Sequence, residues 1–144
     1  MRKSFRDKYL RPLKFILPQS SYSQEGEDLI LKRYFKSRKN GFYVDVGAHH
    51  PFRFSNTALF YEMGWSGINI DATPGSKKLF DKYRKKDISI EYIVSDKSEL
   101  ISFYMFDEPA LNTCDPFTYE SVIADGYRLV NKCQIRTMSL KDIL

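Results

Sequence analysis

The sequence predicts an α/β domain with a mostly parallel sheet, and two observations predict it. The first is the order of the segments: three short apolar stretches of strand type, residues 42–46, 66–71 and 88–96, alternate with segments of helix type. This order predicts parallel strands joined by right-handed crossovers. The second is the length of 144 residues with 42% hydrophobic and 15% aromatic residues, which suits one domain with one core.

The first helix and the first strand have clear local signals. Ser23, followed by acidic residues, predicts the N-cap of a helix that ends at the turn Asn40-Gly41. Residues 42–46, "FYVDV", are apolar on both faces, which is typical of a central parallel strand. Ser55 then predicts the cap of a second helix, and Gly64 its C-terminal end.

The next elements complete the predicted parallel sheet. Residues 66–71, "SGINID", read as the second strand, and Pro74 opens a third helix at a position that tolerates proline. The run "KKLFDKYRKK", residues 77–86, is interpreted as a solvated face of this helix. The third strand is predicted over residues 88–96, "ISIEYIVSD".

The pattern changes after Asp96. Residues 101–107 alternate and predict a strand, and residues 132–140 predict another. Between them, residues 108–128 contain two prolines and a glycine, and we expect one helical turn there. Ser139 and Asp142 form a capping box that predicts a last helix.

The charge is concentrated in a basic arm, residues 1–20, that precedes the predicted domain, residues 21–144. Within the first eighteen residues six Lys and Arg stand against one Asp, which accounts for the net charge of +5. Because the folded part is neutral, we expect no nucleic-acid partner. Apolar residues at helical spacing in the arm predict weak peripheral contact with a membrane, and a solubilising extension is the simpler alternative.

Other signals concern the cellular setting. The arm lacks the apolar run of a signal peptide, and no transmembrane segment is expected. Cys114 and Cys133 have neither metal-like spacing nor the pattern of a disulfide framework. We therefore expect a reducing, cytoplasmic location.

Three carboxylates near strand ends suggest a ligand site. In a doubly wound sheet, ligands bind beyond the carboxyl ends of the strands. Gly47 lies just past the first strand, where the backbone can approach a ligand closely, and Asp45, Asp71 and Asp96 lie at or near the three strand ends. The turn lacks the G-x-G-x-x-G of a dinucleotide site, which disfavours a nicotinamide-dependent oxidoreductase. The pattern favours an adenosine ligand without phosphates, of which S-adenosylmethionine is the common one.

Four segments of the sequence, which include these residues, also resemble a known protein family. The segments "SQEGEDLIL", "GFYVDVGAHHPFRFSNTALFYEMGWSGINIDATP", "IEYIVSD" and "TMSLKDIL", in this order, resemble the FkbM family of S-adenosylmethionine-dependent methyltransferases. The resemblance implies a Rossmann-like, class I methyltransferase fold. It also implies O-methylation of a hydroxyl on a small acceptor, such as a sugar, with S-adenosyl-L-methionine as the cofactor.

The resemblance implies roles for individual residues. The turn from Asp45 to Ala48 would hold the methionine part of the cofactor, Asn56 would face its carboxylate, Asp71 would hold the ribose, and Asp96 would border the adenine. The segment Gln24 to Asp28 would line the mouth of the site. The implied cofactor-binding set is Asp45, Gly47, Ala48, Asn56, Asp71 and Asp96.

Several of these residues also have a structural interpretation. Asp45 equally suits a buried aspartate that bonds backbone amides of the turn, and Asp96 equally suits a plain turn. His49 and His50 are the only histidines, so a metal site lacks a third ligand of that type, and none is predicted. They read as turn formers or helpers at the cofactor mouth, and either is a candidate general base for a hydroxyl.

The resemblance also implies that part of the fold is missing. In the family, the segment like "TMSLKDIL" leads into a further strand, reading like I-D-V-E-G, and then into the rest of the sheet and the acceptor pocket. Without that part, the sheet is incomplete on its C-terminal side and one flank of "FYVDV" is unpaired. We therefore expect a fragment of an enzyme. The alternative is a non-catalytic module that pairs through its open sheet edge, with another copy for example; enzymatic activity of the 144 residues alone is left open.

Overall fold

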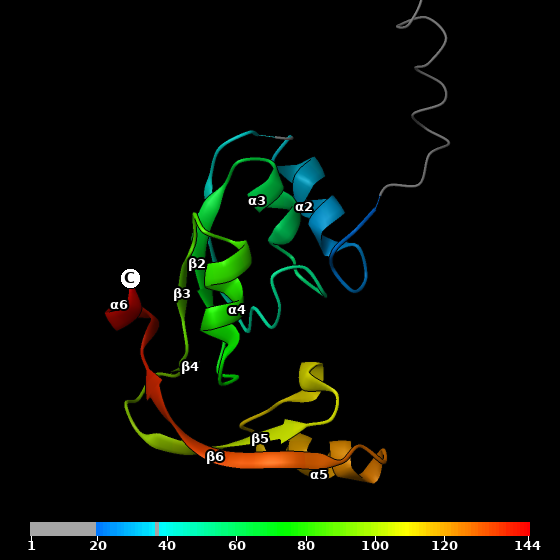
Figure 1. Ribbon diagram of the computed structural model, residues 1–144, viewed down its shortest axis with the longest axis vertical. Coiled ribbons are helices and arrows are strands. Elements are labelled where there is room, and N and C mark those ends of the chain that lie inside the picture. Colours follow the sequence, from blue (N-terminus) through cyan, green and yellow to red (C-terminus); the bar gives the residue numbers. More distant parts are fainter. Residues whose placement is uncertain (1–19, 37) are drawn as a thin grey trace, which may run out of the picture.

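The computed structural model describes residues 20–36 and 38–144, which form a mixed α/β structure with two small sheets (Figure 1). The first sheet is parallel and has the order β1-β2-β3, with β1 at Phe42–Val46, β2 at Ser66–Ile70 and β3 at Ile88–Ile90. The predicted parallel sheet is therefore present, with three strands. Residues 1–19 of the basic arm, on which the expected membrane contact depends, lie outside the described residues.

Three helices lie on the same face of the parallel sheet. They are α2 (Glu27–Tyr34), α3 (Ala58–Glu62) and α4 (Ser76–Tyr83), and Figure 1 shows all three on one side of β2 and β3. The short C-terminal helix α6 (Leu140–Ile143) lies on the other side. Within the described part of the chain, no helix has the length and apolar character that crossing a membrane requires.

Three helices begin later than the sequence predicted. The N-cap of α2 is Gly26, with a positive φ of 86°, and not Ser23, whose hydroxyl bonds Asp28 instead. The N-cap of α4 is Gly75, so Pro74 precedes the helix rather than opening it. The N-cap of α3 is Thr57 and not the predicted Ser55, although Ser55 Oγ accepts from the backbone N–H of Ala58, the first residue of α3, at 3.1 Å.

The predicted third strand is wrong as a single element. The segment divides into β3 and β4 (Ile93–Val94), and β4 leaves the parallel sheet to pair with β6 (Leu129–Met138). Between them, Glu91 turns toward α4, where its carboxylate accepts from the backbone N–H of Lys77 at 2.9 Å. Asp96 consequently follows a strand of the second sheet, and Glu91 follows the last strand of the parallel one.

The second sheet is built mainly from a long antiparallel pair. β5 (Leu100–Phe106) runs against β6, and β4 lies on the other side of β6. The region between β5 and β6 contains the 3-10 helix η2 (Pro109–Leu111) and the nine-residue helix α5 (Pro116–Ala124), not the single turn predicted. The prolines read as helix breakers, but Pro116 occupies the first turn of α5 behind the cap Asp115. The prediction that Ser139 caps the last helix is confirmed.

The two faces of β1 differ in chemistry and in burial. Phe42, Val44 and Val46 point to the face opposite the three helices and are exposed. Tyr43 and Asp45 point to the helix-covered face, as the alternation of a strand requires. The polar side chains of this strand therefore lie inside the structure, and its apolar ones lie outside.

β1 also forms an open edge of the sheet. The carbonyl of Gly41 accepts from Ser66 N, and Gly47 N donates to the carbonyl of Ile70. In a parallel ladder the backbone direction alternates, so the N–H and C=O groups of residues 42, 44 and 46 face away from β2. Across residues 20–36 and 38–144, no strand pairs with this edge. The unpaired flank expected from the sequence is confirmed for this part of the chain.

Candidate functional site

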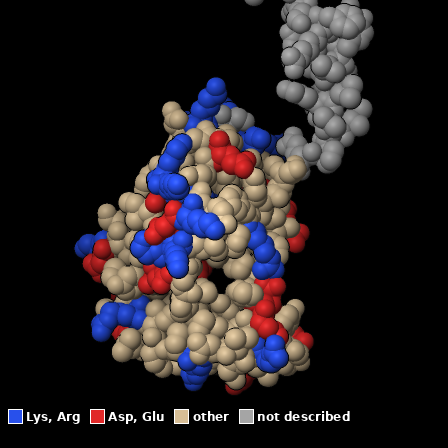
Figure 2. Space-filling model, in the orientation of Figure 1, with Lys and Arg blue, Asp and Glu red and all other residues tan. Residues whose placement is uncertain are grey.

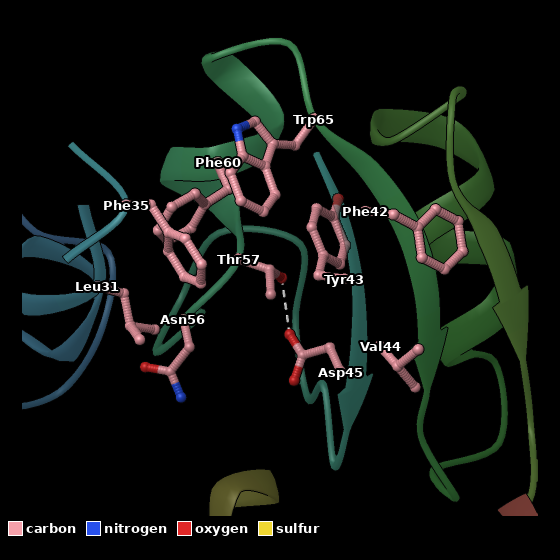
Figure 3. Close-up of a pocket in the computed structure, with 10 residues that line it drawn as sticks. All are labelled: Leu31, Phe35, Phe42, Tyr43, Val44, Asp45, Asn56, Thr57, Phe60 and Trp65. Carbon is pink, nitrogen blue, oxygen red and sulfur yellow. Dashed lines mark hydrogen bonds between the residues drawn. The ribbon is translucent and has the colours of Figure 1, made fainter. Parts of the chain in front are cut away.

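A pocket of about 310 Å³ lies along β1, between this strand and helices α2 and α3 (Figure 3). Its volume falls at the lower end of the range of small-molecule sites. Most of its walls are apolar or aromatic, and they contain one carboxylate. The lining residues are Leu31, Phe35, Phe42, Tyr43, Val44, Asp45, Asn56, Thr57, Phe60 and Trp65.

Asp45 is the charged group of this pocket. Figure 3 shows its side chain pointing toward Thr57, whose hydroxyl lies 2.7 Å from Oδ2. Burial raises the pKa of this carboxyl, whereas the Thr57 hydrogen bond and the charge of Arg84 lower it. The expected alternative, in which Asp45 bonds backbone amides of the turn, is not what the structure shows, because the partner is a side-chain hydroxyl.

A fully buried arginine lies behind Asp45 and Thr57. The side chains of Arg84 and Asp87 are both 0% exposed and are joined by an ion pair of 2.9 Å. The guanidinium also lies 2.8 Å from the Tyr43 hydroxyl and from Thr57 Oγ1, and 3.0 Å from the carbonyl of Pro51. A buried charge is tolerated only when it is paired and its donors are satisfied, and this network meets both conditions.

The prediction of a solvated face over residues 77–86 is therefore wrong for Arg84. The lysines beside it are exposed, but Arg84 leaves the helix at its C-cap and turns inward. Sequence reasoning also missed Tyr43 and Asp87 as partners. The sequence of residues 77–86 gives no local signal that distinguishes Arg84 from the neighbouring lysines. Its burial depends on the strands that pack against it.

The turn after β1 brings Gly47, Ala48 and Asp71 together. Gly47 has a φ of 75°, and a Cβ added there would meet no atom within 4 Å, so the turn faces open space. The N–H groups of Gly47 and Ala48 donate to the carbonyl of Ile70, at 2.8 and 3.1 Å. These bonds fix the turn at the carboxyl end of β2, where ligands of parallel sheets bind.

Asp71 braces this turn with both carboxylate oxygens. Oδ2 accepts from the backbone N–H of His49 and Oδ1 from that of Thr73, each at 2.8 Å. A carboxylate oxygen has two acceptor sites, so each oxygen keeps capacity for one further donor. Asp71 thus has a structural role that does not exclude contact with a ligand.

The two histidines differ in their surroundings. His50 is a turn former, because its Nδ1 accepts from the backbone N–H groups of Phe52 and Arg53, at 3.1 and 3.0 Å. His49 has a φ of 55°, and its Nε2 lies 3.4 Å from Nη1 of Arg53. Burial lowers the pKa of both imidazoles. Over residues 20–36 and 38–144, no group of three metal-ligating side chains is found.

The remaining candidates lie in separate places. Asn56 is exposed and lines the pocket. Asp96 is exposed after β4 and accepts only from Ser95 Oγ, at 3.3 Å, within the described chain. Of the predicted mouth segment, Asp28 is fully buried and accepts from the Ser21 hydroxyl at 2.6 Å. The structure thus groups five of the six predicted cofactor residues around β1 and its turn, and leaves Asp96 apart; binding of a cofactor by any of them stays a prediction.

The chain was compared with protein-family models, with curated proteins and with solved structures. None of the three comparisons gives a match.

The arrangement has the parts of a small-molecule binding site. It combines an apolar pocket, one carboxylate with an oxygen that no described residue bonds, and a glycine turn that faces open space. A ligand with an apolar body and a hydrogen-bond donor suits these features.

Proposed function

We propose that this chain is the S-adenosylmethionine-binding part of an O-methyltransferase of the FkbM type, with a Rossmann-like fold. The supporting observation is the turn after β1, where Gly47 faces open space two residues after Asp45 and the carboxylate of Asp71, which directly follows the adjacent strand β2, bonds the turn at His49. The acceptor is a hydroxyl of a small molecule such as a sugar. The free cysteines Cys114 and Cys133 agree with the reducing, cytoplasmic setting that the proposal includes.

Each part of the site has a task in this proposal. Gly47 lets the backbone approach the methionine part, and Asp45 accepts from its amino group. Asp71 receives the ribose hydroxyls on the acceptor sites that its two backbone hydrogen bonds leave free. The bound cofactor supplies an activated methyl group, so the protein has to bind, align and take up a proton.

Of the two histidines, His49 is the better candidate for the base. Nδ1 of His50 already accepts two backbone hydrogen bonds, which protonation would break. Burial lowers the pKa of His49, so its imidazole is neutral at pH 7 and able to accept a proton.

Calorimetric titration with S-adenosylmethionine and S-adenosylhomocysteine tests the proposal. We expect saturable binding that weakens about tenfold or more in Asp45→Asn and in Asp71→Asn, because each change removes a charged acceptor. Asp125→Asn, at the exposed end of α5, is the matched control and should bind like the parent. A folded chain that binds neither compound would refute the proposal.

The open edge of β1 supports a second candidate function, a non-catalytic module that pairs through this edge with a second copy. Phe42 is 61% exposed and Val46 52% exposed, and backbone donors and acceptors face outward beside them. Such an edge favours strand pairing between chains.

Light scattering over a range of concentrations tests this candidate. A dimer that Val44→Lys converts to a monomer would support it, since a charge on an edge strand disfavours pairing. Phe117→Lys, which removes an exposed aromatic residue of α5, should leave the dimer intact. A monomer at all concentrations would exclude pairing with a second copy.

A further inference from the structure

The guanidinium of Arg84 sets the direction of the hydrogen bonds around it. A guanidinium has N–H donors and no acceptor, so each oxygen that it bonds must accept. Its Nη2 lies 2.8 Å from both the Tyr43 hydroxyl and Thr57 Oγ1. Each hydroxyl therefore accepts from Arg84 and keeps its single proton for another partner. For Tyr43 that partner is Asp87, at 2.6 Å.

The partner that remains for Thr57 is Asp45. Thr57 Oγ1 lies 2.7 Å from Asp45 Oδ2. The neighbouring hydroxyl of Ser55 is 3.4 Å away and already accepts from the N–H of Ala58 at 3.1 Å. Thr57 therefore donates to Asp45, and Oδ2 of Asp45 is an acceptor that carries no proton.

The second oxygen of Asp45 has a defined place as a result. Figure 3 shows it directed away from Thr57, within the pocket. Among the described residues, Oδ1 has no hydrogen-bond partner. It is therefore available to a donor that enters the pocket.

We propose that Arg84 is a positioning residue of this pocket. Through Thr57 it holds one oxygen of Asp45, favours the ionised carboxylate, and leaves the other oxygen as an acceptor toward the pocket. The inference rests on the proposed function only for the identity of the ligand that this oxygen receives.

On balance the pKa of Asp45 is raised, and the influences that oppose this rise come from Thr57 and Arg84. Burial is the largest influence and raises the pKa of Asp45, and the carboxylates of Asp71 and Asp87 raise it further. The hydrogen bond from Thr57 and the charge of Arg84 oppose this rise. Without the Arg84–Thr57 connection, Asp45 would keep only the influences that favour its protonated form.

The experiment is a pH titration of the Asp45 side-chain carboxyl by carbon-13 NMR, with no ligand present. Thr57→Val keeps the shape of the side chain but removes the hydroxyl, and we expect it to raise the pKa of Asp45. Thr57→Ser restores the hydroxyl and should restore the pKa. A merely structural role of Thr57 would move neither value.

Arg84 is tested by two further variants. Replacing the ion pair as a unit, Arg84→Met with Asp87→Asn, avoids an isolated buried charge and should raise the pKa of Asp45. Arg84→Lys keeps the positive charge but loses the guanidinium that bonds the hydroxyls of both Tyr43 and Thr57. It should raise the pKa of Asp45 by less than the double variant does. Asp87→Asn alone keeps the guanidinium and should not raise it. An unchanged pKa of Asp45 in folded Thr57→Val and Arg84→Lys chains would overturn the inference.

The titration separates this inference from the proposed function. If the Asp45 pKa follows the expected pattern but neither cofactor form binds the parent chain, the positioning role stands and the proposed function fails. If the cofactor binds but the pKa of Asp45 is unchanged in Thr57→Val and Arg84→Lys, the proposed function stands and the positioning role fails.

Discussion

Arg84 is a buried, charged side chain. The effect of replacing it on the free energy of unfolding depends on whether its partner Asp87 is replaced as well. Its partner Asp87 has a side chain that is 0% exposed, so loss of the guanidinium leaves a carboxylate buried without its counter-charge. Asp87 would keep its bonds from Gly67 N and Asn69 Nδ2, which are 3.0 and 2.9 Å long. These neutral donors compensate only part of the lost ion pair.

We predict that Arg84→Met lowers the free energy of unfolding by about 3–5 kcal/mol, the usual result of breaking a buried pair on one side. The double change Arg84→Met with Asp87→Asn should cost less, because no uncompensated charge remains. Urea denaturation of both variants and the parent measures the two differences. Equal losses in the single and double variants would contradict this account.

At the scale of elements, the pairing of β1 with β2 leaves no room for a side chain at Gly67. Tyr43 lies opposite Gly67 in the register of the two strands. A Cβ at Gly67 would overlap the ring and the backbone carbonyl oxygen of Tyr43. The ring in turn is fixed by the bonds of its hydroxyl to Asp87 and Arg84, so it has little freedom to move aside.

Gly67→Ala should therefore destabilise the parallel sheet by about 1–3 kcal/mol or more, as overpacking of a fixed interior does. Ser66→Ala, at the neighbouring position of β2, is the control and should cost much less. Thermal unfolding followed by circular dichroism compares the two. A Gly67→Ala chain as stable as the parent would show that Tyr43 can move.

At the scale of the whole molecule, side-chain contacts tie the parallel sheet to the second sheet. Arg53, in the turn after β1, makes a two-pronged ion pair with Glu108, next to η2, at 2.7 and 2.8 Å. Asn112 Nδ2 also donates to Thr73 Oγ1 at 3.2 Å. Figure 2 shows acidic and basic side chains interspersed over this face of the molecule, without a continuous basic surface.

The Arg53–Glu108 pair should make stability depend on pH in acid. The hydrogen bond from Arg53 holds the pKa of Glu108 at about 2, below its ordinary value of 4.5. Because the folded state binds this proton less readily, the pair stabilises above about pH 4.5, and the contribution is lost as pH falls toward 2. The effect should be modest, since both side chains are partly exposed.

Thermal unfolding of the parent and of Glu108→Gln between pH 7 and pH 2 measures this contribution. The difference in melting temperature should shrink as the pH falls through this window. Asp125→Asn, which lies away from the pair, is the matched control and should not reproduce the change. A difference that stays constant with pH would argue against the ion pair as its source.

Several elements of this fold were predictable because their signals are local. Short apolar stretches identified β1 and β2, alternation identified β5, and the hydroxyl of Ser139 caps α6 as the sequence indicates. The open flank of β1 was also expected. For the site, the turn at Gly47 and its neighbour Asp71 were both found by their positions after apolar strands. Such features depend on a few adjacent residues and on the geometry of the backbone.

Other features were decided only by tertiary structure. The segment 88–96 has the composition of one strand, but pairing with β6, some forty residues later, divides it and carries Asp96 away from the other carboxylates. Arg84 looks like its basic neighbours in sequence, yet only it meets the buried oxygens of Tyr43, Thr57 and Asp87. The sequence by itself determined the positions of β1, β2 and β5 and the cap at Ser139, because those depend on neighbouring residues. Which charge enters the interior, and which strand joins which sheet, depend on partners distant in the chain, and only packing brings those partners together.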